Sequence, residues 1–358
     1  MMKNYAVVDL FCGVGGLTHG LKLKKFNVVA GLDIDATCQY AFDKNNGKSK
    51  FYNIDILQLT PEELDALYPK GKRKILVGCA PCQPFSLYNK KRNKPAEIIK
   101  DTKWKLLDTF ADLILATQPE IVSMENVLSL EIFNKGKVLQ SFIKKLESGD
   151  YKVSIFRVNA QDYGVPQRRK RLVLFGTKND APIQIISPTH TKGSYVTVGM
   201  ALKDLPKLKN GETSNKDPLH HCRKLGALNL RRIRATREGG FWREWPEELK
   251  LACHKKEGGK SFRSVYGRMR RNDVAPTMTT YCIGLGNGRF GHPTEDRAIS
   301  LREAAIFQDF PRKYDFINPD VKFSAANLAR QIGNAVPVGL GKVIGESIIK
   351  HLKENGKI

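Results

Sequence analysis

The sequence has 358 residues, 41% of them hydrophobic, and its 60 Lys and Arg against 36 Asp and Glu give a net charge of +24. This length allows a large core and two domains, and the lack of an apolar run of about 18 residues excludes a membrane span. The positive charge favours association with polyanions, but charge alone does not separate DNA from RNA, an anionic membrane or a merely basic soluble protein.

The N-terminal segment MMKNYAVVDLF has neither the apolar stretch nor the cleavage site of a secretory signal. We therefore expect a cytoplasmic protein. Its seven cysteines are an odd number without framework spacing, which favours reduced thiols over disulfides.

Apolar, strand-like segments alternate with helical segments in the first half of the chain. Strands are expected at residues 5–11, 27–35, 51–56, 74–80 and 120–127, and helices after the first two strands and at 104–119. This alternation predicts a doubly wound, mostly parallel α/β sheet of the Rossmann-like type. Such sheets bind ligands at the carboxyl ends of their strands, so the polar side chains that follow the strands are the site candidates.

The pattern changes near residue 177. Residues 177–265 are rich in Pro, Gly and charge, with 18 Lys and Arg against 9 Asp and Glu. Helical spacing returns at residues 300–310, where Ser300 and Glu303 have the spacing of a capping box, and at 324–352. The irregular middle is expected to form a second, smaller domain.

A glycine turn, DLFCGVGG (9–16), follows the first strand and opens a helix. A dinucleotide fingerprint would need a third glycine after Gly13 and Gly15, but Thr18 stands there. Asp33, at the end of the second strand, can bind ribose hydroxyls. A nucleoside such as S-adenosylmethionine therefore fits better than NAD, and a tight turn without any ligand is an equal alternative.

The segment CAPCQPFS (79–86) has three interpretations. A redox pair is disfavoured because Pro84 and the following segment indicate an extended loop. A zinc site needs further ligands, for which only 220–222 and 253–254 are candidates. Cys79 ends an apolar strand and is expected in the core, whereas Cys82 stands between prolines at the ligand edge and is the candidate nucleophile.

Two further segments carry candidate catalytic side chains. Glu125 of MENV (124–127) ends a buried strand, where burial favours a protonated carboxyl that can donate a proton, although it can equally cap the next helix. In QRRKR (167–171), Arg169 and Arg171 would share one face of a strand and bind phosphate or a base edge. The alternative is a basic turn before that strand.

Together these stretches resemble the DNA cytosine-5 methyltransferases, most closely those of bacterial type II restriction–modification systems. DLFCGVGGLTHG is similar to the first motif of that family, CAPCQPFS to its proline–cysteine motif, and MENV and QRRKR to the two motifs that follow. RNDVAPTMTT (271–280) and QIGNAVP (331–337) are similar to its later motifs. The motifs keep the family's order over most of the chain.

The resemblance implies covalent catalysis on a cytosine flipped out of duplex DNA, with the methyl group supplied by S-adenosylmethionine. Cys82 would attack carbon 6, and Glu125 would contact ring nitrogen 3 and the exocyclic amine. Arg171 and Arg169 would hold the base and a neighbouring phosphate, with Gln83 and Ser86 among the DNA contacts.

The resemblance also implies a cofactor pocket. Asp33 would bind the ribose, Ile34 the adenine and Asp55 the adenine amine. The other residues expected to line the pocket are Phe11, Gly13, Gly15, Gly16, Leu17, Pro81, Leu106, Asn334 and Val336. No metal is expected.

In the domain organisation that the resemblance implies, residues 1–186 and 322–358 form the catalytic, cofactor-binding domain, onto which the last helix folds back. Residues 187–321 form the target-recognition domain, whose aromatic run 241–245 is either a core cluster or a DNA contact. The loop 86–103 either closes over DNA or is a solvated surface loop. We expect a monomer that acts on duplex DNA, with no membrane partner and a cognate restriction endonuclease.

Three other functions stay open. A transfer-RNA methyltransferase of the same fold is disfavoured by the large basic middle region, and a catalytically silent DNA-binding protein by the presence of Cys82, Glu125 and Arg171. A nicotinamide oxidoreductase is disfavoured by Thr18.

Overall fold

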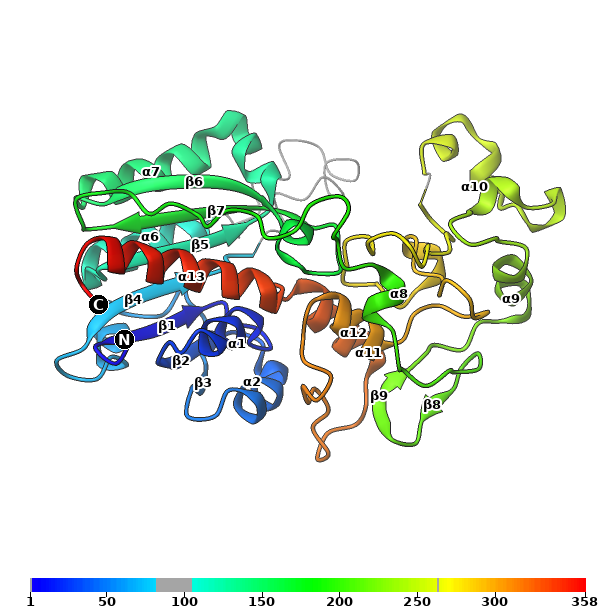
Figure 1. The fold of residues 1–358 in the computed structure, drawn as a ribbon, viewed down its shortest axis with the longest axis horizontal. Helices are drawn as coiled ribbons and strands as arrows, with labels where there is room; N and C mark the ends of the chain where they lie inside the picture. Colours follow the sequence, from blue (N-terminus) through cyan, green and yellow to red (C-terminus); the bar gives the residue numbers. More distant parts are fainter. Residues whose placement is uncertain (1, 82–104, 263) are drawn as a thin grey trace. The chain divides into compact units, whose positions relative to one another are not determined.

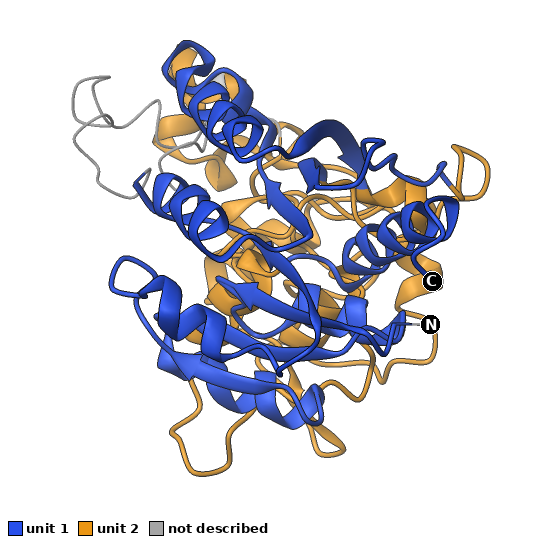
Figure 2. Ribbon diagram, turned by 90° about the vertical axis from the view of Figure 1, so that its left-hand side faces the viewer, with its two compact units in different colours: residues 1–159, 170–188, 336–358 blue, residues 160–169, 189–335 orange. Residues whose placement is uncertain are grey.

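The computed structural model of the chain describes residues 2–81, 105–262 and 264–358. It divides into two compact units, coloured separately in Figure 2. Unit 1 comprises Met1–Asn159, Lys170–Pro188 and Val336–Ile358, and unit 2 comprises Ala160–Arg169 and Thr189–Ala335. Compared with the expected domains, unit 2 also includes residues 160–169 and 322–335.

Unit 1 is built on a seven-stranded sheet of order β3-β2-β1-β4-β5-β7-β6 (Figure 1). Its strands are β1 (Tyr5–Leu10), β2 (Val28–Asp33), β3 (Lys50–Asn53), β4 (Arg73–Gly78), β5 (Ile121–Asn126), β6 (Lys152–Asn159) and β7 (Lys170–Thr177). The first five are parallel, and β7 lies antiparallel between β5 and β6. The predicted doubly wound, mostly parallel sheet is confirmed.

Both faces of this sheet are buried, as the continuous apolar strands predict. One face packs Val8, Leu76 and Val122 against α3 (Pro61–Ala66), α6 (Lys105–Thr117) and α7 (Lys137–Ser148). The alternate residues Val7 and Val77 are equally buried, and because side chains alternate along a strand they face the other side. The short segments η1 (Ala36–Cys38) and α2 (Gln39–Asn45) connect β2 to β3.

The C-terminal helix α13 (Val338–Glu354) packs against α1 (Gly16–Leu23), as the resemblance implies. The two helices approach closely at Gly20, where an added Cβ would lie 2.4 Å from the Val338 carbonyl oxygen. A larger residue at position 20 would therefore push α13 away from the first helix of the sheet.

Unit 2 consists of short elements joined by long irregular segments. They are α8 (Val198–Ala201), β8 (Thr213–Ser214), β9 (Asp217–His221), α9 (Ala227–Arg234), α10 (Ala252–Lys255), α11 (Leu301–Phe307) and α12 (Ala325–Asn334). α11 begins with the predicted capping box of Ser300 and Glu303. Within the described ranges of both units, no helix combines the length and apolar character that crossing a bilayer requires.

Candidate active site

The candidate site lies along the carboxyl edge of the sheet in unit 1. Parallel strands end at the same edge, so the residues that follow β1, β2, β4 and β5 are brought together there. The strand order reverses between β1 and β4, and the segments after these two strands carry the glycine turn and Cys79.

The glycine turn positions a carboxylate from the neighbouring strand. Gly13 and Gly15 have φ of 50° and 84°, a left-handed conformation that glycine adopts without strain. The Gly13 amide donates to Asp33 Oδ2 at 2.8 Å, and the Asp35 amide donates to Asp33 Oδ1 at 2.9 Å. These two bonds fix the Asp33 carboxylate beside the glycine turn.

Thr18, in the helix that follows the glycine turn, contacts a buried carboxyl group of β1. Its hydroxyl donates to Asp9 Oδ2 at 2.6 Å, and both side chains are buried. Burial raises the pKa of Asp9 to about 7; the Thr18 hydrogen bond opposes this rise, and the charge of Asp33 adds to it. In the sequence Thr18 stands out only as the missing third glycine, and its contact with Asp9 was not predicted.

The residues around this turn fit a nucleoside. Ile34, directly after β2, is 68% exposed, which leaves an apolar surface for a planar base. A Cβ added at Gly13 would meet no atom within 4 Å, so there is open space above the turn. Asp55 is half-buried and accepts a hydrogen bond from the Leu57 amide at 3.0 Å.

The other predicted pocket residues are distributed over both units. Phe11 and Leu106 pack at the edge of the main core cluster, Leu17 and Val336 are buried, and Pro81 is half-buried. Asn334, at the end of α12, is exposed and belongs to unit 2. Among the described residues, no group of three or more His, Cys, Asp or Glu could hold a metal.

Glu125 is 2% exposed near the end of β5. Its Oε1 lies 2.9 Å from Arg171 Nε, and Cys79 Sγ lies 2.8 Å from its Oε2. The 3-10 helix after β5, Leu128–Glu131, begins after Val127 without a side-chain cap, so Glu125 does not cap it. The guanidinium provides charge compensation that this buried carboxylate needs.

Arg169 and Arg171 have different environments. β7 begins at Lys170, so Arg169 precedes the strand and does not share a strand face with Arg171. Arg169 is 4% exposed; its Nη1 donates to the Met278 carbonyl at 2.9 Å, and its Nη2 to the Gly333 and Ala335 carbonyls, both at 3.3 Å. These bonds hold together segments of unit 2.

Three predicted residues, Cys82, Gln83 and Ser86, lie outside the described residues, as does the loop 86–103. Cys79, expected in the core, is half-buried and contacts Glu125. This contact was not predicted from the sequence, nor was the hydrogen bond from Asn126 Nδ2 to the Ala80 carbonyl at 3.2 Å. The available signal was that Cys79 and Asn126 both stand at the ends of predicted strands, 74–80 and 120–127.

The aromatic run 241–245 forms part of a core. Trp242 and Trp245 are 5% and 3% exposed and cluster with Leu249. Trp242 also stacks on His254 with ring centroids 4.2 Å apart. Of the two alternatives for this run, the structure therefore shows the core cluster.

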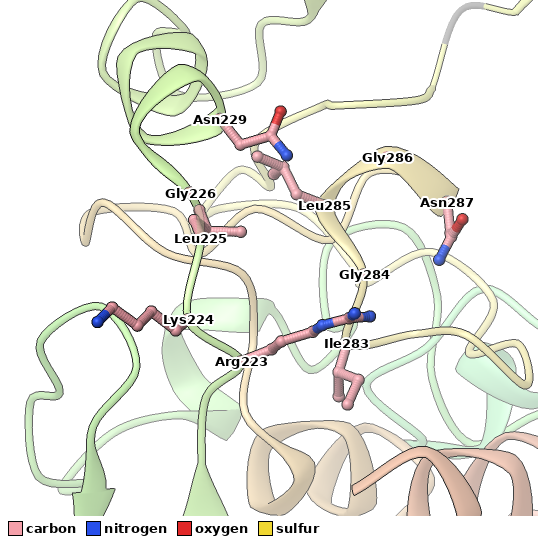
Figure 3. Close-up of a pocket in the computed structure, with 10 residues that line it drawn as sticks. All are labelled: Arg223, Lys224, Leu225, Gly226, Asn229, Ile283, Gly284, Leu285, Gly286 and Asn287. Carbon is pink, nitrogen blue, oxygen red and sulfur yellow. The ribbon is translucent and has the colours of Figure 1, made fainter.

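Unit 2 contains a pocket of about 350 Å³ between the segments 223–229 and 283–287 (Figure 3). Arg223 extends along the segment of Ile283 and Gly284, and Asn229 and Asn287 also line the pocket. Two asparagine amides, exposed Arg223 and Lys224, and the peptide groups of Gly284 and Gly286 are the kinds of group that contact phosphates and base edges.

The fold and site define a nucleoside-binding α/β enzyme with an acidic residue and an arginine paired at its ligand edge. The chain belongs to the C-5 cytosine-specific DNA methylase family, whose sequence model matches residues 5–350. It is thus a DNA cytosine-5 methyltransferase of the type II class, and S-adenosylmethionine is the cofactor.

Individual relatives agree with this family. The chain is 51% identical to the type II methylase M.HgiDII of Herpetosiphon aurantiacus, over 97% of this chain and 96% of that one. It is 29% identical to the type II methyltransferase M1.HphI of Haemophilus parahaemolyticus, over 96% and 86%. A prophage-encoded E. coli protein assigned as a DNA modification methyltransferase superposes with a TM-score of 0.73 at 23% identity, covering 98% and 99% of the two chains, which supports the fold.

Proposed function

We propose that the chain methylates carbon 5 of a cytosine flipped out of a specific duplex DNA sequence, through a covalent adduct between Cys82 and carbon 6 of the base. The observation that carries this proposal is the buried pair of Glu125 and Arg171 at the ligand edge. Glu125 also contacts Cys79, in the segment that leads into Cys82.

Carbon 5 of cytosine is a weak nucleophile, so the chain's groups must activate the ring. Addition of the Cys82 thiolate to carbon 6 makes carbon 5 an enamine-like donor. Glu125 contacts ring nitrogen 3 and the exocyclic amine of the cytosine. Arg171 stabilises the negative charge that develops on the ring next to Glu125 as the thiolate adds. S-adenosylmethionine, when bound, supplies the electrophilic methyl group.

Once carbon 5 carries the methyl group, a base removes the carbon 5 proton, and the carbon 6–sulfur bond breaks to restore the ring and the Cys82 thiolate. Water is a candidate for this base. The reacting atoms are hidden in a duplex, so the base must first leave the stack, which costs about a few kcal/mol.

Within unit 1, the fixed carboxylate of Asp33 is proposed to bind the ribose, Ile34 the adenine face and Asp55 the adenine amine. The other predicted pocket residues of unit 1 are proposed to line this site. The hydrogen bond from Gly13 supports the assignment of Asp33, because it holds the carboxylate beside the open space of the turn.

Residues 187–321 are proposed to read the DNA sequence, with the pocket of Figure 3 as part of the contact surface. Arg223 and Lys224 would contact phosphates, and Asn229 and Asn287 base edges. Arg171 would hold the base, whereas the buried bonds of Arg169 support a structural role inside unit 2. We further propose a cytoplasmic monomer with a cognate endonuclease that acts on the same site.

A duplex with 5-fluorocytosine at the target tests the chemistry, because fluorine cannot leave as a proton and the adduct is trapped. Mass spectrometry of a digest should place the base on the peptide that contains Cys82. Cys82→Ser should form no adduct and transfer no methyl group, because a hydroxyl is hardly ionised at neutral pH. An adduct on another residue, or methylation by Cys82→Ser, would refute the proposal. Bisulfite sequencing of DNA from expressing cells would give the site.

A further inference from the structure

The Glu125 carboxylate is held from two directions. Arg171 on β7 pairs with Oε1 at 2.9 Å, and the Cys79 thiol, one residue past the end of β4, lies 2.8 Å from Oε2. Glu125 is almost fully buried, whereas Cys79 is half-buried. The chemistry proposed above uses Arg171 and assigns no part to the Cys79 thiol.

The contact has the polarity of a charge-assisted hydrogen bond. An ionised carboxylate only accepts hydrogen bonds, and a thiol can donate one. In this contact the Cys79 thiol is the donor and Glu125 Oε2 is the acceptor. Hydrogen bonds with an ionised partner are stronger than neutral ones.

The Cys79 contact restricts a rotation of the Glu125 carboxylate that the Arg171 contact leaves free. The terminal torsion of a glutamate is broad rather than confined to sharp rotamers, so the Arg171 contact at Oε1 alone does not set the plane of the carboxylate. A donor at Oε2, here the Cys79 thiol, does set that plane. That plane determines whether Glu125 can meet two adjacent groups on the edge of a planar base.

The segment that carries the thiol is itself fixed. The Cys79 amide donates to the Leu10 carbonyl at 3.3 Å, which extends the contact between β4 and β1 by one residue. Asn126, next to Glu125, donates to the Ala80 carbonyl at 3.2 Å. The Cys79–Ala80 segment is thus anchored to β5 at two consecutive positions.

We infer that Cys79 is a positioning residue for methyl transfer, whose thiol fixes the plane of the Glu125 carboxylate against the cytosine. This inference rests on the proposed role of Glu125. Cys79 acts through that carboxylate, and it touches neither the base nor the methyl donor.

Three substitutions separate hydrogen bonding from packing. Cys79→Ser keeps a donor, Cys79→Ala removes both donor and volume, and Cys79→Val supplies apolar volume without a donor. We expect the Ala and Val variants to lose about tenfold to a hundredfold in kcat, the effect of one lost hydrogen bond to a charged group. KM for duplex DNA should stay within about threefold, and Cys79→Ser should stay within about threefold of wild-type kcat.

Two matched controls accompany these variants. Cys253→Ala removes an exposed thiol in unit 2 and should leave kcat unchanged. Urea unfolding of each Cys79 variant shows whether a loss of kcat reflects a loss of folded protein. An active Cys79→Val with an impaired Cys79→Ser would show that packing, and not hydrogen bonding, matters at this position, which would overturn the inference.

The trapping experiment distinguishes failure of this inference from failure of the proposed function. If wild-type protein forms no adduct with the 5-fluorocytosine duplex, the proposed function fails. If wild type forms the Cys82 adduct and Cys79→Ala forms it at the same rate with unchanged kcat, only the inference about Cys79 fails. We expect slower trapping in both Cys79→Ala and Cys79→Val.

A spectroscopic measurement needs no activity. The S–H stretching band of a thiol lies in an infrared window free of other protein bands, and hydrogen bonding lowers its frequency. The difference spectrum between wild type and Cys79→Ser should show a lowered band that shifts upward in Glu125→Gln. A band at the frequency of a free thiol, insensitive to Glu125→Gln, would contradict the hydrogen bond.

Discussion

Units 1 and 2 satisfy their buried polar groups in different ways. In unit 1 the ladders of the seven-stranded sheet pair the backbone. In unit 2 the regular elements are short, and arginines bond the backbone instead: Arg268 donates to the carbonyls of Ile233, Thr236, His292 and Glu295 at 2.7–3.0 Å. Buried carbonyls need such donors wherever no ladder supplies them.

The difference extends to the placement of charge. All the buried arginines of the described residues lie in unit 2: Arg169, Arg232, Arg268, Arg297 and Arg302. Unit 1 buries the carboxylates Asp9 and Glu125 at its ligand edge. A large positive charge in a sequence therefore does not measure the DNA-binding surface, because part of it holds an irregular unit together.

The comparison predicts that a change at the edge of unit 1 affects chemistry more than folding. Glu125→Gln keeps the size of the side chain but removes the negative charge that pairs with Arg171. We expect methyl transfer to fall by about 10²- to 10⁴-fold, the usual contribution of a positioned acid or base, with a change of roughly 1–2 kcal/mol in the free energy of unfolding. Labelled-methyl incorporation and urea titration measure the two effects. Activity within tenfold of wild type would contradict the prediction.

A buried arginine of unit 2 should show the reverse pattern. Arg297 and Glu303 are each 1% exposed and joined by two hydrogen bonds of 2.9 and 2.7 Å. Burial raises the pKa of Glu303. The hydrogen bonds and charge of Arg297 lower this pKa by more than burial raises it, so the net shift is downward. Arg297→Met leaves that carboxylate buried without its partner and should cost about 3–5 kcal/mol of stability.

Two further variants test whether burial sets the size of this loss. Arg297→Met combined with Glu303→Gln removes the orphaned charge and should recover part of the loss, since the amide oxygen can still cap α11. Arg237→Met breaks an ion pair whose arginine is 81% exposed and should cost less than about 1 kcal/mol. Urea titration measures the free energy of unfolding of each variant. Equal losses in Arg297→Met and Arg237→Met would show that burial does not determine how much an arginine contributes to stability.

The sequence predicted unit 1 well because its signals are local. Apolar runs bounded by turns marked five strands, and the site candidates followed those strands directly. The Arg169 contacts were not predictable in this way, because its partners Met278 and Gly333 lie 109 and 164 residues further along the chain. A basic run has the same local pattern whether it faces a phosphate or a buried carbonyl.

The pairing of Cys79 with Glu125 shows the same limit within unit 1. The two residues are 46 positions apart, and their contact depends on β4 and β5 being neighbours in register. The apolar pattern of β4 correctly indicated a strand, but it placed Cys79 in the core, whereas β4 ends one residue before it. Errors of one or two residues at a strand end decide whether a side chain packs or faces a ligand.

The carboxylate beneath the glycine turn should make the stability of the protein depend on pH. The pKa of Asp9 is about 7 in the folded state against 3.8 ordinarily, so between these values the folded state holds a proton that the unfolded state has released. Stability from this group is complete below pH 3.8 and falls as pH rises towards 7, by up to about 1.4 kcal/mol per pH unit. Asp9→Asn does not titrate and should remove this slope.

Urea unfolding of wild type and Asp9→Asn at pH 5, 6, 7 and 8 measures that difference. The variant can be less stable in absolute terms, so only the slopes are compared. Asp180→Asn changes an exposed carboxylate in the same unit and should leave the wild-type slope unchanged. Parallel curves for wild type and Asp9→Asn would show that Asp9 does not titrate in this range.

The smallest expected effect concerns the exposed cations of the pocket in unit 2. Arg223 and Lys224 are exposed there, unlike the buried arginines, so replacing them should weaken DNA binding without unfolding the protein. Each phosphate contact contributes about one to the slope of log affinity against log salt concentration. The double variant Arg223→Gln, Lys224→Gln should therefore reduce the magnitude of that slope by up to about two, with an unchanged unfolding curve.

Lys152→Gln, an exposed change on β6 of unit 1, should leave the slope as in wild type. A slope that is unaltered in the double variant would mean that the pocket does not contact phosphates. An equal reduction in Lys152→Gln would mean that the net charge of the whole chain, and not the pocket, sets the salt dependence.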